Sequence, residues 1–143
     1  MRSITVFTSN QPRHLGLVIE LSKVYEKVYA IIECNTVKPG EVKDFFDKSE
    51  IMKSYFSQVM RSEREIFGEI SFLPKNVSPL ILKMGDLNKI HIDVLSTSLN
   101  SENFVVFGSS FIKGDLIDIL IKKKCLNIHM GVSPFYRGSS CNF

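Results

Sequence analysis

The sequence predicts an α/β fold in which a mostly parallel, twisted β-sheet is flanked by helices. Short apolar segments rich in β-branched residues alternate along the chain with longer segments of helical periodicity. Segment 3–33 reads as strand, helix, strand within about 30 residues, the length of one βαβ unit. Because such a unit has a right-handed crossover, its two strands are expected to lie parallel in one sheet. The 143 residues suffice for one domain with a sizeable core.

Each element is expected for a local reason. Segment 3–8 is β-branched and aromatic before a polar turn, and segment 14–25 places Leu17, Leu21 and Val24 on one helical face. The further elements expected, in order, are a strand at 27–33, a helix at 41–67 whose apolar stripe includes Ile66, short strands in FLP and LILKMG, a turn into a short helix in MGDLN, a central strand at 103–108, a helix at 113–123 and a buried strand at 125–129.

The composition indicates a cytoplasmic protein. Three cysteines, an odd number without a C-x-x-C pair, argue against a disulfide framework or a structural zinc site. No apolar run approaches 18 residues and the N-terminus lacks a signal-peptide core, so no membrane span is expected. The net charge of +3 permits an anionic small-molecule ligand. Nucleic acid is not favoured, because the basic residues form no obvious binding face.

Polar residues follow three of the expected strands, where ligands bind in open parallel sheets. Ser9 and Asn10 follow the first, 108–110 the central one, and Asn127 and His129 end the last. The first two strand ends lack G-x-G-x-x-G and a Walker lysine, so the dinucleotide and nucleoside triphosphate fingerprints are missing.

Asn127 and His129 form the sharpest of these signals. Side chains alternate along a strand, so the two are expected on one face, with Leu126 and Ile128 packed on the other. An amide donor can hold a developing oxyanion, and an imidazole can move a proton near neutral pH, which suits acyl transfer to an amine. Two alternatives are a pair that only satisfies loop backbone groups and, less favoured, a metal site formed by His129 with a cysteine, Cys125 or Cys141.

The segment 104–138, FVVFGSSFIKGDLIDILIKKKCLNIHMGVSPFYRG, resembles the central part of the 10-formyltetrahydrofolate-dependent formyltransferases. That family, which acts on methionyl-tRNA, glycinamide ribonucleotide and sugar nucleotides, has an apolar strand ending in Gly, a short loop, a helix and then N-x-H-x-S-L-L-P before an aromatic residue and Gly. The resemblance implies a Rossmann-like N-terminal catalytic domain over 1–143, with 10-formyltetrahydrofolate as formyl donor.

The resemblance implies roles for particular residues. Asn127 would polarise the formyl oxygen, and His129 would assist the tetrahedral intermediate or its proton transfer. The residues matched to the pterin-binding loop are Gly108, Ser109, Ser110, Phe111, Ile112 and Lys113. The candidates for contact with the acceptor amine, a small molecule that is phosphorylated or nucleotide-linked such as an amino-sugar nucleotide, are Ser9, Asn10, Arg13 and Arg137. For Arg137 the alternative of capping its own loop is slightly favoured. The resemblance favours tRNA less as an acceptor and implies no metal.

Two departures from the family pattern limit the match. Gly131 and the triplet 132–134, VSP, replace the family's Ser and L-L-P. The family's catalytic Asp, several tens of residues after the His, has no counterpart, because every Asp of this chain precedes His129. The resemblance therefore implies an incomplete N-terminal part of a formyltransferase that is inactive by itself. The alternatives are a formyltetrahydrofolate hydrolase and a non-catalytic binding domain on the same fold.

Overall fold

The structure is a computed structural model that describes residues 1–34, 50–69, 72–129, 131 and 135. The elements in chain order are β1 (Ser3–Ser9), α1 (Pro12–Val24), β2 (Lys27–Cys34), α3 (Glu50–Phe67), β3 (Val77–Lys83), three short 3-10 helices η1 (Asp86–Asn88), η2 (Ile92–Leu95) and η3 (Ser98–Asn100), then β4 (Asn103–Phe107), α4 (Asp115–Lys122) and β5 (Leu126–Asn127). Expected and observed strands agree closely for β1, β2 and β4.

The five strands form one parallel sheet in the order β3-β2-β1-β4-β5. The chain starts in the middle of the sheet, runs outward to β3, and returns to β4 and β5 on the other side of β1. This is the arrangement of a Rossmann-like α/β fold, so the expected fold class is confirmed. β3 is an edge strand, and this explains how it accommodates Pro79, which has no backbone N–H to donate.

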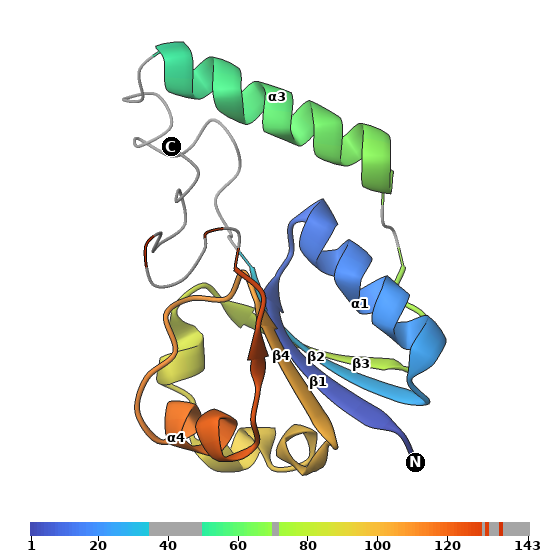
Figure 1. Ribbon diagram of the computed structural model, residues 1–143, viewed down its shortest axis with the longest axis vertical. Coiled ribbons are helices and arrows are strands. Elements are labelled where there is room, and N and C mark those ends of the chain that lie inside the picture. Colours follow the sequence, from blue (N-terminus) through green and yellow to red (C-terminus); the bar gives the residue numbers. More distant parts are fainter. Residues whose placement is uncertain (35–49, 70–71, 130, 132–134, 136–143) are drawn as a thin grey trace.

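The sheet lies between α1 on one face and α4 with the 3-10 helices on the other (Figure 1). Because side chains alternate along the strands, the core is divided into two layers. One cluster lies against α1, and its buried members are Ile4, Val6, Val18, Val28, Ala30, Ile32, Val77 and Val105. The other lies against α4 and the 3-10 helices, and its buried members are Phe7, Ile31, Leu87, Leu95, Phe104, Ile112, Leu116 and Leu120. The helices on the two faces therefore bury both sides of the central strands, as the continuous apolar runs predict.

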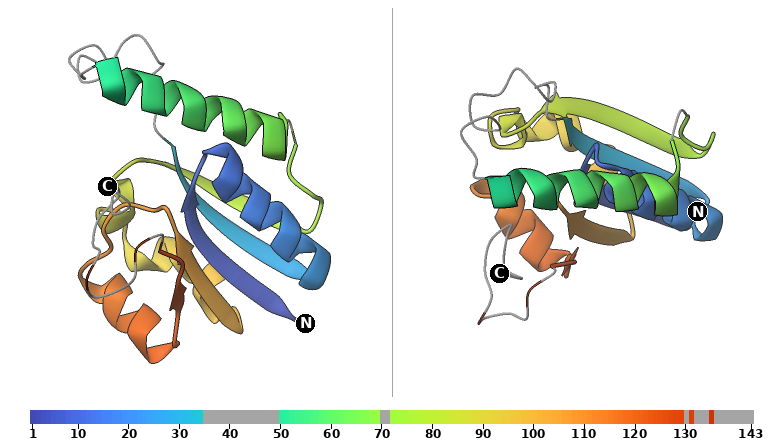
Figure 2. Two further views of the ribbon diagram at one scale, coloured as in Figure 1. Left: turned by 45° about the horizontal axis from the view of Figure 1, so that its top comes forward. Right: turned by 90° about the horizontal axis from the view of Figure 1, so that it is seen from above.

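α3 lies over α1, on the side of α1 that faces away from the sheet (Figure 1, Figure 2). A side chain on Gly16 would meet the ring of Phe67 at 2.8 Å, so glycine permits the close approach of the two helices. Arg13 of α1 also pairs with Glu63 of α3. Residues 41–49 of the expected helix lie outside the described residues. Ile66 was expected on the packed face, but this is wrong: its side chain is 73% exposed, because α3 contacts α1 rather than the sheet.

The last strand differs most from the expectation. A buried strand was expected at 125–129, but β5 covers only Leu126 and Asn127 at the edge of the sheet. Leu126 and Ile128 were expected to pack, and this is wrong, since they are 67% and 43% exposed. Leu126 pairs with Val105 and so lies on the face that carries α1. α1 contacts β1 and β2, whereas β5 lies two strands from β1 at the edge of the sheet.

Candidate functional site

The candidate site lies at the carboxyl edge of the sheet, where β1 and β4 are neighbours. The chain leaves β1 in one direction and β4 in the other, and a crevice forms at such a switch point in open parallel sheets. The register pairs Thr8 of β1 with Phe107 of β4, and Val106 of β4 with Asn127 of β5. The three strand ends that carry polar residues therefore meet at one edge.

The loop after β4, residues 108–113, begins at a glycine that no other residue can replace without cost. Gly108 has φ +76°, in the left-handed region. A Cβ at this position would also stand 2.2 Å from the ring of His14, which lies beneath it. The ring of His14 contacts Phe107 edge to face, with 4.5 Å between the ring centroids. Gly108 therefore allows the loop to turn directly over the start of α1.

His14 and Ser9 form a buried polar pair below this loop. Ser9 Oγ lies 2.5 Å from His14 Nδ1, and both residues are almost fully buried. Burial, and to a smaller extent the charge of Arg13, lowers the pKa of His14 to about 4. His14 is therefore neutral at physiological pH, and the Ser9 hydroxyl is engaged inside the protein rather than presented to the crevice.

Glu33, at the end of β2, restrains the same loop from below. Its carboxylate is fully buried. Oε2 accepts a hydrogen bond from the N–H of Ser110 at 2.6 Å, and Oε1 accepts one from the Ser110 hydroxyl at 2.9 Å. Oε1 also accepts from the N–H groups of Gly85 at 2.9 Å and Leu87 at 3.3 Å, just after β3. One carboxylate thus joins the segments that follow β3 and β4.

Asn88, at the end of η1, restrains the loop from a second side. Its Nδ2 donates to the carbonyl oxygen of Phe111 at 2.8 Å, and its Oδ1 accepts from the N–H of Lys113 at 3.0 Å. The amide side chain thus pairs with the loop backbone much as a neighbouring strand would. We call Glu33 and Asn88 together the loop clamp.

The side chains of the 108–113 loop divide between core and surface. Ile112 is buried in the core cluster on the α4 face, and this anchors the loop to the sheet. Phe111 is 84% exposed, and Lys113 is exposed as well. Ser109 donates from its hydroxyl to the carbonyl oxygen of Ser110 at 3.1 Å. The loop therefore offers an exposed aromatic ring beside backbone groups that a flat, polar-edged ligand could contact.

Asn127 lies on the same face of the sheet as this loop. It pairs with Val106, whose side chain packs on the α4-face cluster to which Ile112 also belongs. Its side chain is exposed. The N–H of Ile128 donates to the carbonyl oxygen of Val106 at 2.9 Å, which continues the pairing just beyond β5. The structure thus places Asn127 beside the start of the loop across a single strand pair.

His129 is exposed and follows β5 by two residues. Its Nδ1 lies 3.2 Å from the backbone nitrogen of Gly131 and 3.1 Å from the carbonyl oxygen of Gly131. If Nδ1 accepts from Gly131, Nε2 carries the proton, and if Nδ1 donates, Nε2 is the basic nitrogen. The ring can therefore present either a donor or an acceptor at Nε2.

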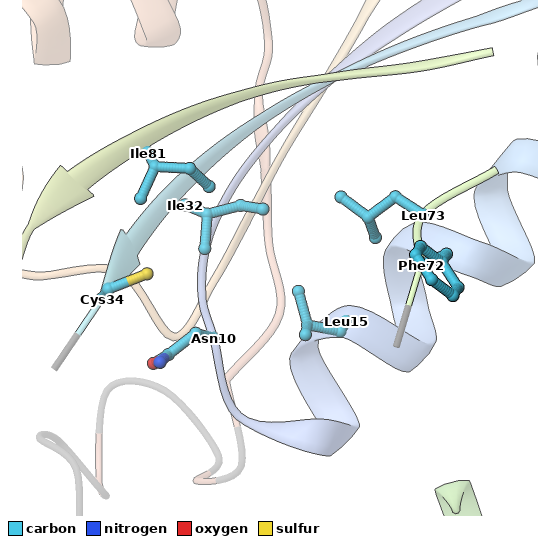
Figure 3. Close-up of a pocket in the computed structure, with 7 residues that line it drawn as sticks. All are labelled: Asn10, Leu15, Ile32, Cys34, Phe72, Leu73 and Ile81. Atoms are coloured by element: carbon cyan, nitrogen blue, oxygen red, sulfur yellow. The ribbon is translucent and has the colours of Figure 1, made fainter. Parts of the chain in front are cut away.

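The residues proposed for the acceptor side are not all brought together. Ser9 is bound to His14, and Arg13 is paired with Glu63 of α3. Asn10 lines a separate hollow of about 200 Å³ on the α1 side of the sheet (Figure 3). The other side chains around the hollow are Leu15, Ile32, Cys34, Phe72, Leu73 and Ile81. This hollow is apolar and smaller than most ligand sites, so it is a poor match for a charged acceptor. Arg137 lies outside the described residues.

Three residues of this edge were not found by sequence reasoning. Glu33 carried a weak signal, since it is an acidic residue at the end of the apolar run KVYAIIEC. Asn88 carried none, because its two partners lie 23 and 25 positions along the chain. His14 carried none either, because the loop residues that its ring contacts, Phe107 and Gly108, are distant in the sequence. The carboxylate of Glu33 accepts hydrogen bonds from residues that lie 52 and 77 positions further along the chain.

Among the described residues, no three His, Cys, Asp or Glu side chains are grouped so that they could hold a metal ion. In the same part of the chain, no helix is both long and apolar enough to cross a membrane. Comparisons with protein-family models, with curated proteins and with solved structures found no significant match to this chain.

Proposed function

We propose that this chain binds 10-formyltetrahydrofolate at the 108–113 loop and presents its formyl group to Asn127 and His129 for transfer to an amine. The observation that carries the proposal is the pairing of β4 with β5. It sets Asn127 beside the start of a clamped loop, at the switch point of the sheet. The described stretch 104–129 of the formyltransferase-like sequence pattern thus ends at the edge of the sheet where ligands bind in open parallel folds.

The donor side suits a pterin. A pterin has a flat apolar face and an edge of alternating hydrogen-bond donors and acceptors. The exposed ring of Phe111 offers a stacking surface, and the N–H groups of Phe111 and Ile112 take no part in the loop clamp. Backbone groups held at fixed positions can select such an edge at little entropic cost.

The transfer step assigns one role to each polar residue. The acceptor nitrogen attacks the formyl carbon, and the amide of Asn127 donates to the oxygen as it becomes an oxyanion. His129 takes the proton of the attacking amine and returns it to the folate nitrogen as the C–N bond to the formyl group breaks. The products are an N-formyl amine and tetrahydrofolate. We favour a phosphorylated or nucleotide-linked amine in the cytoplasm, in line with the mild positive charge of +3.

Donor binding is the first test, because the proposal places it at the 108–113 loop and it can be measured without turnover. The ¹⁵N-labelled chain is titrated with 5-formyltetrahydrofolate, a stable analogue of the donor, and with NAD⁺ as a control ligand of Rossmann-like folds. We expect 5-formyltetrahydrofolate alone to shift the amide resonances of 109–113 and of Asn127. Binding of NAD⁺ at the same amides, or no response to the folate at millimolar concentration, would overturn the proposal.

Turnover is the second test and separates formyl transfer from hydrolysis. The test uses a version of this protein that turns over 10-formyltetrahydrofolate at a measurable rate. In that protein, Asn127→Ala and His129→Ala should each lower the turnover rate by about 100-fold or more. Lys89→Ala, on the exposed surface of the η1 turn, serves as the control and should leave it unchanged. Formate release that is independent of any added amine would identify a hydrolase instead, and near-normal rates in both variants would exclude the assigned roles.

A further inference from the structure

We infer that Glu33 and Asn88 are positioning residues that hold the 108–113 loop in its ligand-binding shape before the ligand arrives. The identity of the ligand rests on the proposed function, whereas the restraint on the loop does not. Neither residue belongs to the sequence pattern that suggested the function. They enter from β2 and η1, whereas the pattern begins at β4.

Glu33 is suited to its place by being an acceptor only. Each of the groups that approach its carboxylate is a donor: three backbone N–H groups and the Ser110 hydroxyl. A glutamine here would turn one of its oxygens into an NH₂ group that faces other donors. Because β1 lies between β2 and β4, the carboxylate of Glu33 reaches across the end of β1 to hold the loop. A buried charge needs such partners, so the loop and the carboxylate stabilise each other.

The side-chain amide of Asn88 has one donor group and one acceptor group, and each faces the complementary backbone group of the loop. Its donor meets the carbonyl oxygen of Phe111, and its acceptor meets the N–H of Lys113. Aspartate has the same size but no donor, so Asn88→Asp would set an oxygen against the carbonyl oxygen of Phe111 and leave the bond to Lys113 intact. This substitution changes one hydrogen bond at a partly exposed position and spares the core.

The clamp affects ligand binding through the free state of the loop. It fixes the backbone at Ser110, Phe111 and Lys113 while the ring of Phe111 remains exposed. A loop that is already ordered does not lose that freedom when the ligand binds, and this strengthens binding without any contact between the clamp and the ligand. Loss of the clamp should therefore weaken binding while the bound complex keeps the same structure.

The experiment compares Asn88→Asp and Glu33→Gln with the wild-type chain, and uses Glu102→Gln as the control because Glu102 is exposed near the opposite end of β4. Affinity for 5-formyltetrahydrofolate is measured by amide resonance shifts. We expect binding about tenfold weaker in Asn88→Asp, with the same loop resonances at saturation, and a modestly lower urea midpoint, because the free native state also loses the hydrogen bond to Phe111. Amide hydrogen exchange should accelerate at Ser110 in Glu33→Gln, because its acceptor is altered. It should also accelerate at Lys113 in Asn88→Asp: the bond from Lys113 still forms in the closed loop, but loss of the bond to Phe111 lets the loop open more often. Glu102→Gln should behave as the wild type.

Each outcome decides one of the two proposals. Wild-type affinity in Asn88→Asp would overturn the positioning role, whether or not the urea midpoint falls. If Glu33→Gln does not fold, Asn88→Asp decides alone. If the wild-type chain does not bind 5-formyltetrahydrofolate, the proposed function fails. In that case faster exchange in the variants would still show that the residues restrain the loop, and unchanged exchange rates would overturn the clamp itself.

Discussion

Gly108→Ala should destabilise the protein far more than the same substitution at another left-handed glycine. Gly108 combines a φ of +76° with a ring of His14 that would lie 2.2 Å from a new Cβ. Gly85 has a φ of +88° but nothing within 4 Å of the corresponding position. The two glycines share the backbone strain and differ in the collision, so Gly85→Ala is a matched control.

The magnitude follows from what the collision would displace. Backbone strain alone costs an alanine roughly 1–2 kcal/mol at either position. At Gly108 the ring of His14 must also move, and it is held by the hydrogen bond to Ser9 and the edge contact with Phe107. These interactions contribute roughly 1 kcal/mol each. We therefore expect a loss of roughly 2–5 kcal/mol for Gly108→Ala, against roughly 1–2 kcal/mol for Gly85→Ala.

Urea denaturation followed by circular dichroism measures both losses, and His14→Ala completes a double-mutant cycle. In the His14→Ala background the cost of Gly108→Ala should fall to that of Gly85→Ala, because the colliding ring is gone. The reasoning is refuted if Gly108→Ala costs no more than Gly85→Ala in the wild-type background. It is also refuted if the cost is the same with and without His14.

Two further predictions concern titratable groups. The pKa of His14 falls from 6.5 to about 4 on folding, so the unfolded chain takes up this proton first as the pH drops. The free energy of unfolding should therefore fall between pH 7 and pH 4, by about 2 kcal/mol at pH 5, and urea midpoints of His14→Asn should lack this part of the pH dependence. Burial raises the pKa of the Cys125 thiol to about 11, so iodoacetamide at pH 8 should alkylate it about 100-fold more slowly than in the urea-unfolded chain. Peptide mapping by mass spectrometry separates Cys125 from the other cysteines, and equal rates in the two states would contradict the prediction.

Local patterns were sufficient for β1, β2 and β4, whereas the short strand expected in FLP is wrong, since residues 72–74 form no strand. The apolar runs at 3–8, 27–33 and 103–108 each became a strand within about one residue of the expected bounds. This worked because burial on both faces requires a continuous apolar run, and such a run is visible in a short window. The order of the strands in the sheet could not be predicted from such patterns. The last strand could not either, since LNIH has the apolar pattern of a buried strand although β5 lies exposed at the edge of the sheet.

The candidate site divides in the same way. Asn127, His129 and the 108–113 loop could be proposed from residues that lie within 22 positions of one another. The arrangement of Ser9 with His14, and of Arg13 with Glu63, could not, because each pairing depends on how α1 approaches a neighbour. Both pairings affect the predicted acceptor site, because the sequence analysis treated Ser9 and Arg13 as polar groups available to a ligand.

The sequence by itself determined the fold class, the parallel βαβ start and the strand end at which a functional hypothesis could be placed. These features arise from side-chain periodicity and turn chemistry, which act between near neighbours. Only the tertiary structure decided that Glu33 and Asn88 clamp the loop, that His14 lies under Gly108, and that Leu126 and Ile128 are exposed. Hydrogen bonds and burial depend on which segments meet in space, and these partners stand up to 94 residues apart in the chain.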